Sequence, residues 1–198
     1  MKKITYGLIA GVVFILVFAS CQAVFTFSPF SALRRDPSKL PPEQKEAYAR
    51  DALLSGDPAT MTEAYNLVND LLANDPANPG LNLLAVDLAI GASGLGNLVT
   101  AFNPQAGISS LNDILTMVDT SMLANVGDRI ETAAAGGAEI SSSQYVNAAA
   151  AIVITTAANL PNGFDDIVWT GDTVDPQIQT AVDYAALGGV TIETYFQQ

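Results

Sequence analysis

A helix start that occurs three times sets the fold class of this chain. Asp57-Pro58, Asn78-Pro79 and Asp175-Pro176 each place a carboxylate or amide side chain directly before a proline. Such a side chain caps free backbone N–H groups, and proline at the first helical position lacks an N–H that the helix would not use. The sequence therefore predicts helices that begin at residues 58, 79 and 176.

Apolar residues recur at helical spacing after these starts and in a further segment. The sets are Met61, Ala64, Val68, Leu71 and Leu72; Leu81, Leu84, Ala85 and Leu88; and Leu111, Ile114, Leu115, Val118 and Met122. Ser110 and Asp113 have the spacing of a capping box at the head of the third set. We expect one helix for each set.

The C-terminal part continues the helical pattern. The run from Tyr145 to Leu160 has few polar side chains and predicts a central buried helix with close-packing alanines. The last predicted helix, from Pro176 to about Phe196, is bent or broken at Gly188-Gly189. The best strand candidate, Ile167 to Trp169, is only three residues long. Residues 41–198 are therefore predicted to be one all-α domain, a helical bundle or array.

Residues 48–90 go beyond generic helicity. Ala64, Val68, Leu71 and Pro76 resemble the second helix and closing turn of a tetratricopeptide (TPR) repeat, and Tyr48 and Ala52 match its first helix in degenerate form. The stretch from Leu71 to Ala85 is similar to the opening of the TPR-type lipoproteins, the T components, of bacterial TRAP transporters. That resemblance implies an envelope-anchored helical protein that passes small anionic or apolar ligands to a substrate-binding partner.

The N-terminus has the form of an export signal. Lys2 and Lys3 precede an apolar run, and Phe18-Ala19-Ser20-Cys21 resembles the lipobox of bacterial lipoproteins. This predicts a signal peptide over residues 1–20, a diacylglycerol or fatty acid on Cys21, and a tether over residues 21–40. The alternative is an uncleaved membrane anchor, since about 20 apolar residues span a bilayer. Both place the body outside the cytoplasm, on the periplasmic or extracellular side of a membrane in the cell envelope.

Charge is unevenly distributed along the chain. The sequence has 8 basic and 20 acidic side chains, a formal charge of −12, but 7 of the basic ones lie in the first 50 residues. From Asp51 onward, Arg129 is the single cation among 17 carboxylates, a balance of −16. Such a surface repels phosphate backbones, so we expect no nucleic-acid partner.

Two segments are candidates for binding an ion. Asp165, Asp166, Asp172 and Asp175 surround Trp169 and supply oxygen ligands of the kind calcium prefers, but their spacing does not match an EF-hand. A solvated turn in which Asp175 caps a helix is favoured, and no metal is expected. The glycine-rich stretch 91–96 can cradle an anion, but a helix-ending turn with positive φ is favoured over that reading. Since cations are scarce, we expect Arg129 to pair with Asp87.

Catalysis is not expected. The chain has no histidine, and its single cysteine lies in the lipobox-like segment. No spacing singles out one pair of carboxylates for acid–base chemistry. The sequence favours a partner-binding or scaffold protein with no cofactor apart from its lipid, and the alternative is a small-ligand-binding accessory lipoprotein.

Overall fold

The structure is a computed structural model that describes residues 36–96, 111–171 and 173–196. Its contacts divide the chain into two units, Met1–Lys39 and Leu40–Gln198. The described part of the first unit is the 3₁₀ helix η2 (Pro37–Lys39), where the Lys39 ammonium lies 3.6 Å from the Asp36 carboxylate. The predicted signal peptide, Cys21 and most of the tether lie outside the described residues.

The second unit confirms the all-α prediction. In chain order its helices are α2 (Pro42–Ser55), α3 (Pro58–Leu72), α4 (Pro79–Ser93), α6 (Leu111–Met117), α7 (Thr120–Leu123), α8 (Val126–Ala135), α9 (Ser142–Ala158), η3 (Gly163–Asp166), α10 (Pro176–Leu187) and α11 (Glu193–Phe196). No strand is present within the described ranges, and Ile167 to Trp169 has no regular secondary structure.

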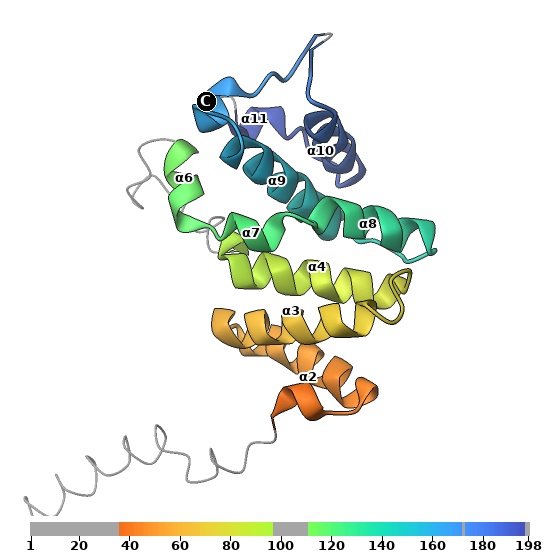
Figure 1. The fold of residues 1–198 in the computed structure, drawn as a ribbon. Coiled ribbons are helices and arrows are strands. Elements are labelled where there is room, and N and C mark those ends of the chain that lie inside the picture. Colours follow the sequence, from red (N-terminus) through yellow and green to blue (C-terminus); the bar gives the residue numbers. More distant parts are fainter. Residues whose placement is uncertain (1–35, 97–110, 172, 197–198) are drawn as a thin grey trace, which may run out of the picture. The chain divides into compact units, whose positions relative to one another are not determined.

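The longer helices α2, α3, α4, α8, α9 and α10 pack side by side in this order (Figure 1). The contacts run from α2 to α3, from α3 to α4, from α4 to α7 and α8, from these to α9, and from α9 to α10. In addition, α2 contacts α4 and α4 contacts α9. The unit is therefore a helical array in which α4 and α9 contact helices both next to them and further along the chain.

All three predicted helix starts are confirmed. The side chains of Asp57, Asn78 and Asp175 accept hydrogen bonds from backbone N–H groups of the first turns of α3, α4 and α10, at 2.9, 3.0 and 2.7 Å. The start of α9 uses a different cap, because the Ser141 hydroxyl and the Gln144 side chain form a capping box. Local sequence thus determines where these four helices begin.

The predicted helix over residues 111–122 is wrong in one respect, because it is interrupted. α6 ends at Met117, and the Asp119 carboxylate caps α7 by accepting from the Ser121 N–H at 3.0 Å. The Asp119 backbone N–H donates to the Ser93 carbonyl oxygen at the end of α4, also at 3.0 Å. The chain leaves the helix at this point because Asp119 serves as a cap and as a link to α4.

The core centres on α4 and α9, as predicted for α9. Nine residues of α4 and seven of α9 are buried, among them Leu88 and Ile154. The buried residues Ala148, Ala149 and Ala151 let neighbouring helices approach α9 closely. Within the part of the chain that the structure describes, no helix is both long and apolar enough to cross a membrane.

Glycines end two helices, as the sequence predicts. Gly94 ends α4 with a left-handed backbone (φ 83°), which favours the helix-ending turn over an anion cradle in this stretch. α10 ends at Leu187, directly before Gly188-Gly189. A Cβ atom on Gly188 would lie 2.5 Å from the Val146 Cγ2 atom of α9, so the close approach of the two helices requires glycine.

Candidate functional site

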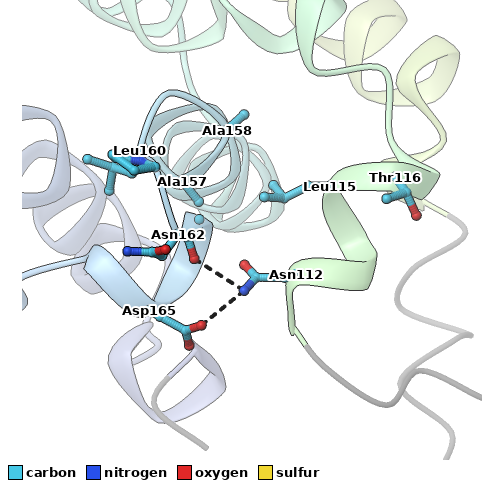
Figure 2. A pocket seen from close by; sticks show the side chains of 10 residues that line it. Asn112, Leu115, Thr116, Ala157, Ala158, Leu160, Asn162 and Asp165 are labelled. Atoms are coloured by element: carbon cyan, nitrogen blue, oxygen red, sulfur yellow. Dashed lines mark hydrogen bonds between the residues drawn. The ribbon is translucent and has the colours of Figure 1, made fainter.

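One open cavity of the described residues lies between α6, the end of α9 and the segment that follows α9 (Figure 2). It has a volume of about 460 Å³ and is wide open to solvent. Its lining consists of Asn112, Leu115, Thr116, Ala157, Ala158, Leu160, Pro161, Asn162, Gly163 and Asp165. The cavity is thus formed by one apolar helix end and one polar turn.

Asn112 holds the polar side of this cavity together. Its amide nitrogen donates to the Asn162 carbonyl oxygen (3.2 Å) and to the Asp165 carboxylate (3.1 Å), as Figure 2 shows. Its amide oxygen accepts from the Phe164 N–H at 2.9 Å. Gly163 has a φ of +64°, and a Cβ atom there would overlap the Asn112 side chain. The polar groups of the rim therefore satisfy one another.

The apolar side of the cavity limits what it can do chemically. Leu115, Ala157 and Leu160 offer methyl groups, and the one charged group in the lining is the Asp165 carboxylate. The lining holds no lysine, arginine or histidine to bind an anion and no base beside a nucleophile. Such a cavity suits a small neutral or cationic molecule with an apolar part.

The described candidate calcium ligands, Asp165, Asp166 and Asp175, do not converge on one site. Asp165 accepts from Asn112, the Asp166 carboxylate accepts from the Asn162 N–H (3.0 Å) and amide, and Asp175 caps α10. Asp172 lies outside the described residues. Within the described ranges, no group of three His, Cys, Asp or Glu residues is placed to hold a metal ion. Each described candidate serves the local turn or helix instead.

Arg129 does not pair with Asp87, so that prediction is wrong. The half-buried guanidinium donates to the Asn69 amide oxygen (2.6 Å) and to the Asn82 amide oxygen (3.3 Å), and it lies 5.7 Å from the centre of the Tyr65 ring. Its Nε atom is buried and has no hydrogen-bond partner among the described residues. These contacts join α8 to α3 and α4, with neutral partners only.

Asp87 instead faces the start of α9. Its half-buried carboxylate accepts from the Gln144 amide nitrogen, with both oxygens at 3.2 Å. Burial raises the pKa of Asp87, and the hydrogen bond from Gln144 offsets part of that rise. The Gln144 amide oxygen accepts from the Ser141 N–H (3.0 Å), so one side chain caps α9 and joins it to α4. Asp87 and Arg129 are thus oriented toward different helices.

Sequence reasoning missed a pair of tyrosines. Tyr145 on α9 and Tyr184 on α10 are half-buried, with ring centres 5.6 Å apart and ring planes at 54°. Burial raises the pKa of Tyr184, and the nearby Glu131, Tyr145 and Asp128 raise it further. The signal in the sequence is weak, because residues far apart in the chain give no local pattern.

Comparisons with protein families, with curated proteins and with solved structures find no match to this chain. The resemblances to TPR repeats and to T components therefore stay predictions. The charge of the chain and the geometry of the described residues are the features that bear on its function.

Proposed function

We propose that this protein is a lipid-anchored helical scaffold of the cell envelope that binds a basic partner protein. The observation that carries the proposal is the position of Arg129. Arg129 is the sole cation after Arg50, and its guanidinium is directed at Asn69 and Asn82. From Asp51 onward the sequence supplies no other cation, so carboxylates dominate the charge of the body.

Electrostatic complementarity explains why such a surface favours a basic partner. A balance of −16 over residues 51–198 attracts positively charged proteins and repels acidic ones. Stacked helices also offer long exposed faces, which are suited to extended or helical segments of another protein. Binding is favoured over catalysis because the chain lacks histidine and the described cavity lacks a nucleophile–base pair.

The anchor of the proposed scaffold is Cys21. Lipid on this residue holds the body near a membrane, where a basic tether containing Arg34 and Arg35 tolerates anionic headgroups. The acidic body is repelled by the same headgroups. The two charges together favour a body that stays clear of the lipid surface and free to bind a protein.

Purification from cell envelopes tests the proposal. The full chain is expressed in a bacterial host that exports it, cross-linked in the intact envelope, and purified after solubilisation in non-ionic detergent. We expect one stoichiometric cross-linked partner with a basic exposed segment. In samples prepared without cross-linker, the same partner should be retained at 50 mM NaCl and lost at 500 mM NaCl, because salt screens charge pairs. Absence of such a partner, or a partner held equally at both salt concentrations, contradicts the proposal.

Cys21→Ser provides the control for the anchor. It should abolish incorporation of labelled palmitate and move the protein out of the membrane fraction, whereas Ser20→Ala keeps a small residue before the cysteine and should preserve both. Undiminished labelling of Cys21→Ser refutes the lipid anchor and leaves the proposal of a basic partner to the cross-linking result.

The cavity at α6 and α9 supports a second candidate function, that of a small-ligand carrier. About 460 Å³ is enough for a small molecule, and its rim and floor combine Asp165 with the apolar Leu115 and Leu160. Native mass spectrometry of the purified protein distinguishes the two functions. A retained small molecule that is lost in Leu115→Trp, which fills the cavity, favours the carrier.

A further inference from the structure

α9 packs against both α8 and α10, and these three helices carry aromatic, apolar and acidic side chains that are at least partly exposed. They include the half-buried rings of Tyr145 and Tyr184, the side chain of Leu187, and the carboxylates of Asp128 and Glu131. We call these five residues the tyrosine patch. Protein–protein interfaces typically have aromatic and apolar side chains at the centre and charged side chains at the edge.

α10 contributes the apolar part of the tyrosine patch. Its core face is formed by Ile178, Ala181 and Ala185, while Tyr184 and Leu187 lie one turn apart along its flank. Leu187 is 60% exposed, and it is one of four large apolar side chains with high exposure in the described ranges. The Tyr184 ring packs on the Tyr145 ring, so two aromatic rings lie together, and Leu187 follows Tyr184 by three residues on the same helix.

α8 contributes the charge. Asp128 and Glu131 are exposed, and the described residues place no lysine or arginine within ion-pair distance of either. α8 packs against α9, the helix that carries Tyr145, so the two carboxylates lie on the helix next to the ring pair. Their repulsion of a tyrosinate contributes to the raised pKa of Tyr184. Arg129 is not available to them, because its guanidinium donates to Asn69 on α3 and Asn82 on α4.

We propose that the tyrosine patch is where the partner protein docks, and that the partner inserts an arginine- or lysine-bearing segment into it. This inference rests on the proposed function, since it locates the site and names the recognised chemistry. The alkyl stem of arginine or lysine packs on Leu187, its cationic end lies over a tyrosine face, and Asp128 and Glu131 supply the opposite charge. An acidic segment is repelled by the same carboxylates, and a purely apolar one leaves them without a partner.

Binding of a fluorescently labelled nona-arginine peptide tests the location of this site. The peptide is titrated with the full chain in non-ionic detergent at 50 mM NaCl, and fluorescence anisotropy gives the dissociation constant. Asp128→Asn combined with Glu131→Gln removes two exposed charges and should weaken binding by about fivefold. Leu187→Ser should weaken it by about threefold, because the arginine stems lose apolar surface.

The matched control is Asp51→Asn combined with Asp70→Asn. It removes the same charge from exposed positions on α2 and α3 and should change the dissociation constant by less than twofold. Equal weakening by the two double variants overturns the tyrosine patch as the site and leaves a basic partner in place. A wild-type chain that does not bind nona-arginine also overturns the inference, whereas the proposed function depends separately on the cross-linked partner.

Discussion

Two helix contacts of this protein each contain a half-buried charge with neutral partners, and they differ in the sign of that charge. At the contact of α8 with α3 and α4, the Arg129 guanidinium is bonded to the amides of Asn69 and Asn82. At the contact of α4 with α9, the Asp87 carboxylate is bonded to the amide of Gln144. The described residues provide no ion pair for either group.

The difference lies in how the rest of the molecule acts on each charge. A guanidinium stays charged in proteins, and here it is surrounded by a body whose balance is −16. The same body disfavours another negative charge, and burial already raises the pKa of Asp87. A strongly acidic protein can therefore hold a half-buried cation with neutral hydrogen-bond partners, while a half-buried carboxylate destabilises it.

The largest effect that tests this comparison is the loss of the Arg129 charge. Arg129→Met keeps an apolar stem but leaves the Asn69 and Asn82 amide oxygens without their donor and Tyr65 without its cation. We expect the free energy of unfolding to fall by about 2 kcal/mol, the usual range for hydrogen bonds to charged groups. Urea unfolding of the purified full chain, followed by circular dichroism, measures it.

Arg50→Met is the matched control for this prediction. Arg50 pairs with Glu46 at 2.6 Å on the exposed side of α2, and such surface pairs contribute little. Its loss should change the free energy of unfolding by less than about 0.5 kcal/mol. If Arg129→Met lowers the free energy of unfolding as little as Arg50→Met does, the half-buried cation does not stabilise the array.

The second test concerns the pH dependence that Asp87 causes. Because its folded-state pKa lies above its ordinary value of 3.8, the folded protein holds the proton more tightly than the unfolded chain. The contribution of Asp87 to stability is therefore greatest below pH 3.8 and is lost as pH rises through the folded-state pKa. Asp87→Asn removes the half-buried negative charge and keeps an acceptor for Gln144. The variant should therefore be more stable than wild type at pH 7, by less than about 1 kcal/mol.

Asp57→Asn gives the opposite sign and serves as the control. Hydrogen bonds from Thr60, chiefly from its hydroxyl, lower the pKa of Asp57, so its contribution is present above pH 3.8 and is lost as pH falls. Urea unfolding between pH 3.5 and 7 should show the advantage of Asp87→Asn growing with pH, while Asp57→Asn becomes relatively less stable. Parallel pH profiles for wild type and Asp87→Asn would contradict a raised pKa at Asp87.

Sequence could predict the helix starts because each depends on its own neighbours. Asp57, Asn78 and Asp175 find their N–H donors within three residues, so pattern and outcome agree. The break before α7 was not predictable in this way. Asp119 ends the run of helical spacing through a bond to the Ser93 carbonyl oxygen, and the apolar spacing alone carries no trace of that distant contact.

The candidate site was less predictable than the fold, for a related reason. The scarcity of cations singles out Arg129 in the sequence, but the predicted pair with Asp87 is wrong because the packing of α8 directs the guanidinium to Asn69 and Asn82. Likewise Tyr145 and Tyr184 become neighbours because α9 and α10 pack together, with Gly188 allowing the close approach. Residue types suggested the chemistry, and tertiary contacts determined the partners.

Salt gives the smallest effect and separates the field of the whole body from local bonds. If the surrounding carboxylates stabilise Arg129 at long range, raising NaCl from 50 to 500 mM should reduce the destabilisation by Arg129→Met by a few tenths of a kcal/mol (about 0.3), because exposed charges beyond a Debye length are screened. The extra stability of Asp87→Asn over wild type at pH 7 should also become smaller when NaCl is raised. Urea unfolding at both salt concentrations measures these differences. If the free energy of unfolding lost in Arg129→Met does not change with salt, the stabilisation by Arg129 comes from its contacts with Asn69, Asn82 and Tyr65 alone. The negative charge of the body would then not explain why the half-buried cation stabilises the protein and the half-buried carboxylate does not.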